Sequence, residues 1–130
     1  MAYRPLAGYP APNDTGKYDF IFDLDGPASY NNTGTFNTSG QQINAADFGL
    51  GGFESLDAPG MSSDGVNVVE IVLGATIAGT NMGAGGVPGS SGTVATTAVI
   101  HWWTNVTRAA EVANTTNLSG KFIRLRIVGV

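Results

Sequence analysis

Apolar side chains recur at every second position in two stretches of this chain. Between positions 18 and 24, one set of alternate residues is aromatic or aliphatic and the other is mostly acidic. The same alternation appears between positions 121 and 128, where Arg124 and Arg126 occupy the more polar set. Because side chains point to opposite faces along a strand, this period of two predicts two half-buried β-strands.

Two interior stretches add strong strand signals. Residues 66–73 are nearly all β-branched or apolar on both faces, which predicts a central strand. Residues 93–104 predict a long strand in which the adjacent Trp102 and Trp103 point to opposite faces.

Other segments carry weaker signals. We expect a short strand over 33–38 and a bent or bulged strand over 43–56, where glycines interrupt the apolar pattern. The Gly-rich stretch 79–92 predicts a loop, and at most two helical turns fit into 106–113.

Short strands separated by turn residues, with 19 glycines among 130 residues, predict an all-β fold. We expect a single β-sandwich or jelly-roll-like barrel over residues 18–130. Residues 1–17 contain three prolines and predict an extended N-terminal arm.

Composition excludes several classes of function. Six Lys and Arg residues and a net charge of −4 cannot form the basic surface of a nucleic-acid-binding protein. The absence of Cys and the presence of a single His argue against a zinc site, and we expect no cofactor. No apolar stretch has the ~18 residues that cross a membrane, and no signal peptide is recognisable.

The sequence Phe-Ile-Phe-Asp-Leu-Asp-Gly at 20–26 resembles the first motif of haloacid-dehalogenase-type phosphatases. That resemblance implies a nucleophilic Asp23 and an acid Asp25, but the residues that follow depart from the family pattern. An EF-hand-like calcium loop starting at Asp23 would need a bidentate Glu where Gly34 stands. We therefore expect Asp25 to belong to a turn and the protein not to be an enzyme.

The charged residues of the two alternating strands suggest how those strands are placed. Asp19 and Asp23 are two strand positions apart on one face, as are Arg124 and Arg126. Such spacing lets opposite charges meet across a strand pair, which would make these strands neighbours. Alternatively, both pairs face water or another subunit.

The single histidine and the tryptophan pair have several interpretations. His101 has no Ser, Cys or carboxylate at a spacing typical of a catalytic relay, so we expect it to be packed. One Trp is expected in the core and the other at the surface, where it would anchor a protein interface or stack on a sugar.

The Pro-rich arm and the Gly-, Ser-, Thr- and Asn-rich β body are similar in composition to small bacteriophage virion proteins, especially capsid cement or decoration proteins. This resemblance implies a structural protein, made in the host cytoplasm, that stabilises the virion by binding the major capsid protein or other virion subunits. It also implies a homo-oligomer, either a dimer or a trimer. The alternatives are a tail, baseplate or fibre-associated virion protein, and a carbohydrate-binding β-sandwich module. The residues expected at interfaces are Tyr3, Leu6, Tyr9, Trp102 and Trp103.

Overall fold

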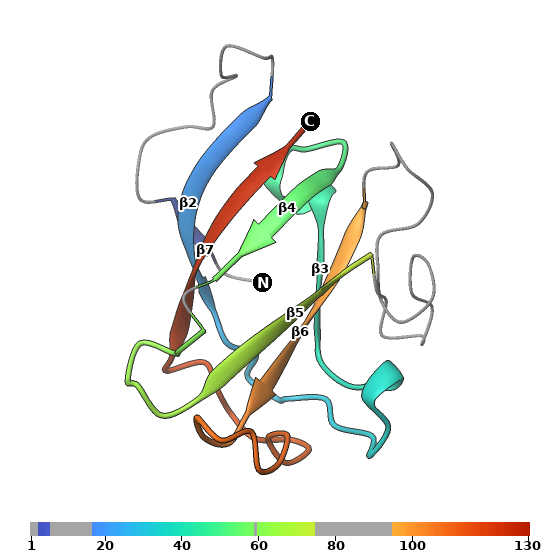
Figure 1. Ribbon diagram of the computed structural model, residues 1–130. Coiled ribbons are helices and arrows are strands. Elements are labelled where there is room, and N and C mark those ends of the chain that lie inside the picture. The colour runs from blue at the N-terminus through green and yellow to red at the C-terminus, as the bar shows by residue number, and fades with distance from the viewer. Residues whose placement is uncertain (1–2, 6–16, 59, 75–94) are drawn as a thin grey trace.

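The computed structural model describes residues 3–5, 17–58, 60–74 and 95–130, which form an almost entirely β structure (Figure 1). The strands in these ranges are β1 (Tyr3–Pro5), β2 (Tyr18–Asp25), β3 (Gln41–Asn44), β4 (Phe53–Asp57), β5 (Val68–Leu73), β6 (Thr97–Trp103) and β7 (Phe122–Gly129). The only helices there are two short 3-10 helices, η1 (Phe36–Thr38) and η2 (Ala45–Phe48). The prediction of an all-β fold class is confirmed.

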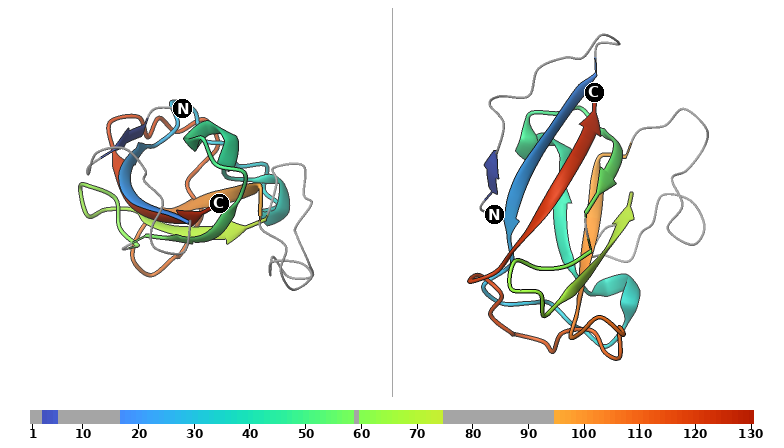
Figure 2. Two further views of the ribbon diagram at one scale, coloured as in Figure 1. Left: turned by 90° about the horizontal axis from the view of Figure 1, so that it is seen from above. Right: turned by 60° about the vertical axis from the view of Figure 1, so that its left-hand side comes forward.

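The strands form two antiparallel sheets (Figures 1 and 2). The first has the strand order β1-β2-β7-β4 and the second the order β3-β6-β5. Residue Phe53 of β4 also forms a two-way backbone bridge with Ala95, just ahead of β6, so the two sheets are tied together at that point.

One hydrophobic core lies between the sheets. Each alternating strand contributes the apolar set predicted from its period, so Phe22 and Leu125 of the first sheet are fully buried. Ile43, Ile100 and Trp102 of the second sheet pack into the same cluster. Aromatic rings from β2, η2 and β4 fill one part of it, with the Phe22 and Phe48 centroids 4.6 Å apart.

The two alternating strands are neighbours, as their charges suggested. β2 pairs with β7 along its whole length, with Asp23 directly opposite Arg124. Arg124 Nε donates to Asp23 Oδ1 at 3.0 Å, and Arg126 Nη2 donates to Asp19 Oδ2 at 2.7 Å. The prediction of cross-strand ion pairs is therefore confirmed.

Three local predictions are wrong. Residues 33–38 contain the 3-10 helix η1 instead of a strand, whereas residues 106–113 contain no helix, which is within the expected limit of two turns. β5 lies at the edge of its sheet, whereas β6 occupies the centre. Residues 43–56 divide into the end of β3, helix η2 and most of β4, because η2 ends at Gly49 in the left-handed conformation and the chain turns there.

The segment between β2 and β3 covers the outer face of β6. Gly40 has a φ of +118°, and a Cβ atom there would lie 2.3 Å from Val99 Cγ1. Only glycine lets the backbone approach β6 so closely, and Val99 is consequently buried although it faces away from the core.

The start of the expected arm adds to the first sheet. β1 pairs antiparallel with β2, with Arg4 opposite Asp23 in the register. The remaining arm residues 6–16, with Leu6 and Tyr9, and the loop expected over 79–92 lie outside the described residues.

Candidate functional site

The two tryptophans lie on opposite faces of β6. Trp102 is fully buried, its Nε1 donates to Gln41 Oε1 at 3.0 Å, and its backbone N–H donates to the Tyr30 hydroxyl at 3.0 Å. Trp103 faces outward and is half-buried. Trp102 is thus a core residue, and the interface hypothesis now concerns Trp103.

Trp103 lies in a row of paired residues that crosses the outer face of the second sheet. Val68 of β5 is opposite Trp103, and isolated bridges pair Met61 with Val68 and Trp103 with Glu111. Directly paired residues on antiparallel strands project to the same face. Met61, Val68, Trp103 and Glu111 therefore share one face of the sheet.

Exposed apolar residues lie on segments that adjoin this row. Phe36 of η1 is 42% exposed and stacks on the ring of His101, with a centroid distance of 3.9 Å. Met61 is 40% exposed. Val66 and Val106, both at least half exposed, lie just before β5 and just after β6, at the same end of the sheet. We call this group the Trp103 patch, and it consists of Phe36, Met61, Val66, Trp103 and Val106.

The indole N–H of Trp103 has no acceptor within the described part of the chain, although the nitrogen is buried. A buried donor without an acceptor costs free energy. No other buried side-chain nitrogen or oxygen in the described ranges lacks a partner. Trp103 therefore places an unfavourable polar group on the outer face of the second sheet.

Behind the patch lies a buried polar network. His101 Nδ1 is 3.0 Å from Glu111 Oε1, and the Tyr30 hydroxyl donates to the same oxygen at 2.5 Å. Burial, and then the hydrogen bond to Glu111, raise the pKa of the Tyr30 phenol far above its usual range. His101 is packed as expected, with 2% of its surface exposed.

The network joins residues from three separate segments, and no sequence pattern predicts that they meet. Glu111 is the carboxylate partner that was missed for His101, because the loop after β6 folds back and pairs residue 111 with Trp103. Tyr30 reaches it from the segment after β2. These hydrogen bonds connect Glu111 in the loop to His101 in β6 and to Tyr30, so they stabilise the loop against the sheet.

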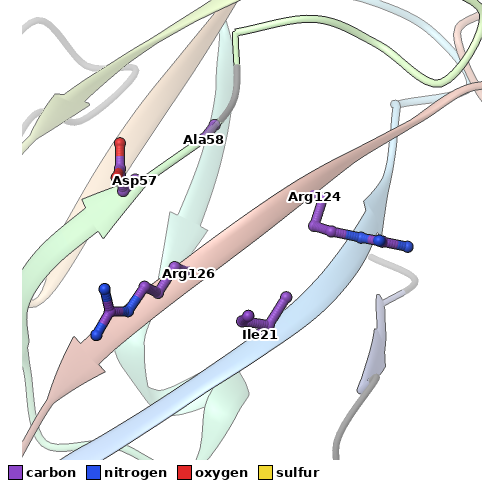
Figure 3. Close-up of a pocket in the computed structure, with 5 residues that line it drawn as sticks. All are labelled: Ile21, Asp57, Ala58, Arg124 and Arg126. Carbon is purple, nitrogen blue, oxygen red and sulfur yellow. The ribbon is translucent and has the colours of Figure 1, made fainter.

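The outer face of the first sheet has a different character. A shallow depression there is lined by Ile21, Asp57, Ala58, Arg124 and Arg126 (Figure 3). Ile21, which is 41% exposed, lies on β2 between the two ion-paired positions, and Arg126 also interacts electrostatically with Asp57. The charges of this face are therefore paired within the chain.

The residues of the phosphatase-like motif are also engaged in the structure. Asp23 is buried and bound by Arg124. Asp25 is the last residue of β2, so the expectation that it belongs to a turn is wrong. In the described ranges, no group of three or more His, Cys, Asp or Glu residues could hold a metal ion.

The remaining predicted interface residues belong to the arm. Tyr3 lies in β1, opposite Leu24 in the register.

The helices of the described ranges have three and four residues, far fewer than a bilayer-spanning helix needs.

Comparison of the chain with known proteins gave no relative. No family model, no curated protein and no solved structure matches it.

Proposed function

We propose that this protein is a structural component of a bacteriophage particle, which stabilises the assembled capsid as a cement or decoration protein. It acts through contacts with the major capsid protein or with other virion subunits. Its partners are proteins, and its own copies form a homo-oligomer.

The finer fold belongs to the same proposal. We infer that the two sheets form a β-sandwich, because their inner faces share one core and alternate residues of both point into it. A sandwich leaves two outer faces for binding, and the two faces here differ in chemistry.

The Trp103 patch is the observation that carries the proposal. It combines a half-buried indole with four apolar side chains that are 40% to 62% exposed, and exposed apolar clusters mark interaction sites. Tryptophan is also among the residues that contribute most to protein interfaces. On the other outer face, by contrast, the arginines already have carboxylate partners within the chain.

Composition supports a protein that works in an assembly. Only 12% of the residues are charged, so the surface has little charge to oppose close association. In a shell, each weak contact is repeated by symmetry, and avidity then makes modest contacts sufficient for stable binding.

The test is loading of the purified full chain onto shells assembled from the major capsid protein of the same genome, measured by co-sedimentation. We expect saturable loading that Met61→Glu reduces at least tenfold. The matched control is Ile21→Glu, which introduces the same charge at an equally exposed position on the other outer face. It should load as the wild type does.

Three outcomes would reject parts of the proposal. If the wild-type chain does not load, the capsid function is wrong, and loading onto purified tails would then favour the tail-associated alternative. If Ile21→Glu abolishes loading and Met61→Glu does not, the Trp103 patch is not the binding surface. Binding to a glycan array that Trp103→Ala removes would favour the carbohydrate-binding module.

A further inference from the structure

One edge of strand β5 pairs with β6, and the described part of the chain leaves most of its other edge open. Gly74 N donates to Thr97 O, and Val69 N donates to Gly60 O on the opposite side. Backbone groups of successive residues in a strand point alternately to the two sides. Val68, Glu70 and Val72 therefore bond to β6, whereas Val69, Ile71 and Leu73 direct their N–H and C=O groups outward.

Among the described residues, only the segment 60–62 covers this outer edge, and it covers the beginning. The segment 60–62 bonds to Val69 N and to Asn67 O. Further along, no backbone group in the described ranges bonds to the outward N–H and C=O of Ile71 and Leu73. A groove runs beside this part of the edge, between β5 and the end of β4, which Figure 1 shows next to each other. The groove is lined by Leu56, Asp57, Ala58, Val69, Glu70, Ile71 and Arg108.

The other three edge strands carry features that oppose pairing with another chain. β1 has three residues and ends in Pro5, and β3 has four residues, of which three are amides. β4 carries Glu54 and Asp57 and has an irregular register. β5 has none of these protections: it is apolar on both faces, and its one charged residue, Glu70, is bound by Arg108 at 2.6 Å.

We propose that two copies of this chain join through the open edges of their β5 strands. The strands pair antiparallel about a twofold axis at Val72, so that Ile71 of each copy pairs with Leu73 of the other. Each such pair exchanges two N–H···O=C bonds, which satisfies the outward groups of both residues in both copies. The interface is isologous, because the same edge of each copy contacts the other.

The charges permit this register. Glu70 lies opposite Gly74 of the other copy, so no like charges meet. The two Val72 side chains come together at the axis as a pair without backbone hydrogen bonds, the type in which side chains lie closest. The result is a continuous six-stranded sheet with the order β3-β6-β5-β5-β6-β3.

This dimer adds to the proposed function. The dimer itself is independent of that function, and only its biological role rests on it. The twofold axis is perpendicular to the joined sheet, so the Trp103 patches of both copies face the same side. A shell that repeats one binding site would then engage both patches of a dimer, and the second contact adds avidity.

The experiment measures the mass of the purified full chain by light scattering after size-exclusion chromatography. The wild type should have the mass of two chains. Val72→Lys places two ammonium groups side by side at the axis and should yield a monomer, as should Val72→Glu. Mixing these two variants should restore the two-chain mass, because opposite charges then meet across the same axis.

Two further variants separate loss of pairing from loss of folding. Val72→Thr is the control with a similar shape and no charge, and it should remain dimeric. Ile71→Pro removes an outward N–H and leaves the ladder to β6 in place, so it should be monomeric. It also loses the packing of the Ile71 side chain against the core, so its circular dichroism spectrum is recorded to check that the variant is folded. A monomeric wild type would overturn the proposal, as would an oligomer that Val72→Lys and Ile71→Pro leave unchanged. None of these outcomes depends on shell binding, so the dimer and the capsid function are tested separately.

Discussion

His101 Nδ1 lies 3.0 Å from Glu111 Oε1, although His101 is in strand β6 and Glu111 is in the loop that follows it. The loop returns to the strand through a hydrogen bond from Thr104 N to Ala110 O at 2.9 Å. Since an ionised carboxylate can only accept, Nδ1 carries the proton in this pair whenever Glu111 is charged. The tyrosine hydroxyl that shares Oε1 extends the network to the core side of the sheet.

The first prediction concerns that hydroxyl. Tyr30→Phe keeps the buried ring but leaves the Trp102 backbone N–H without its acceptor and Glu111 without one donor. The free energy of unfolding should fall by about 1–3 kcal/mol, measured by urea denaturation. Tyr18→Phe, at a half-buried ring, is the control and should change it by less than about 0.5 kcal/mol. A Tyr30→Phe protein as stable as the wild type would mean that the network contributes nothing to stability.

The second prediction is a loss of stability in alkali. The pKa of Tyr30 is raised in the folded protein, so above the unfolded value of 10.0 the unfolded chain releases a proton that the folded chain retains. The contribution of Tyr30 is therefore complete below about pH 10 and decreases as pH rises further, by at most about 1.4 kcal/mol per pH unit. Between pH 9 and 11, the urea concentration at the unfolding midpoint should fall more steeply with pH for the wild type than for Tyr30→Phe. Equal slopes would contradict the raised pKa.

The third prediction concerns acid. The Ser62 hydroxyl donates to Asp64 Oδ1 at 2.6 Å, and Lys121 Nζ lies 3.0 Å from the other oxygen. These contacts, that of Ser62 first, lower the pKa of Asp64 to about 2, against 3.8 for an unperturbed aspartate. The lowered pKa stabilises the protein above about pH 4, and this contribution is lost as pH falls toward 2. The urea midpoint of Asp64→Asn should consequently depend less on pH in this range than that of the wild type.

The periodic part of the fold could be predicted from the sequence. Alternation near both ends gave β2 and β7 within one residue of their observed bounds, and the charges on these strands gave their pairing. The alternation is a local signal, and the pairing follows from the opposite charges on the two strands. The opposite orientation of Trp102 and Trp103 follows from the same period.

What could not be predicted depends on contacts between segments distant in the sequence. The apolar residues of β5 predict a central strand, and Ile71 and Leu73 do pack against the core. In the described structure, however, the outer edge of β5 is hydrogen-bonded only to the segment 60–62. Phe36 suggested a strand by its propensity, but it lies in a 3-10 turn where stacking on His101 fixes its position. The Glu111 partner of His101 depends on the return of a loop, which no periodic pattern marks.

The last prediction compares the two tryptophans by the same substitution. Trp102→Phe removes a fully buried indole and leaves Gln41 Oε1 without its donor, so it should reduce the free energy of unfolding by about 2–4 kcal/mol. Trp103→Phe removes a buried N–H that has no acceptor in the described structure, and the lost apolar area is offset by relief of that unpaired donor. Its free energy of unfolding should stay within about 1 kcal/mol of the wild-type value. Urea denaturation of both variants, followed by circular dichroism, checks the difference. If Trp103→Phe proved as destabilising as Trp102→Phe, the Trp103 side chain would be required for folding, and its place at the surface would have to be explained by stability instead of by binding.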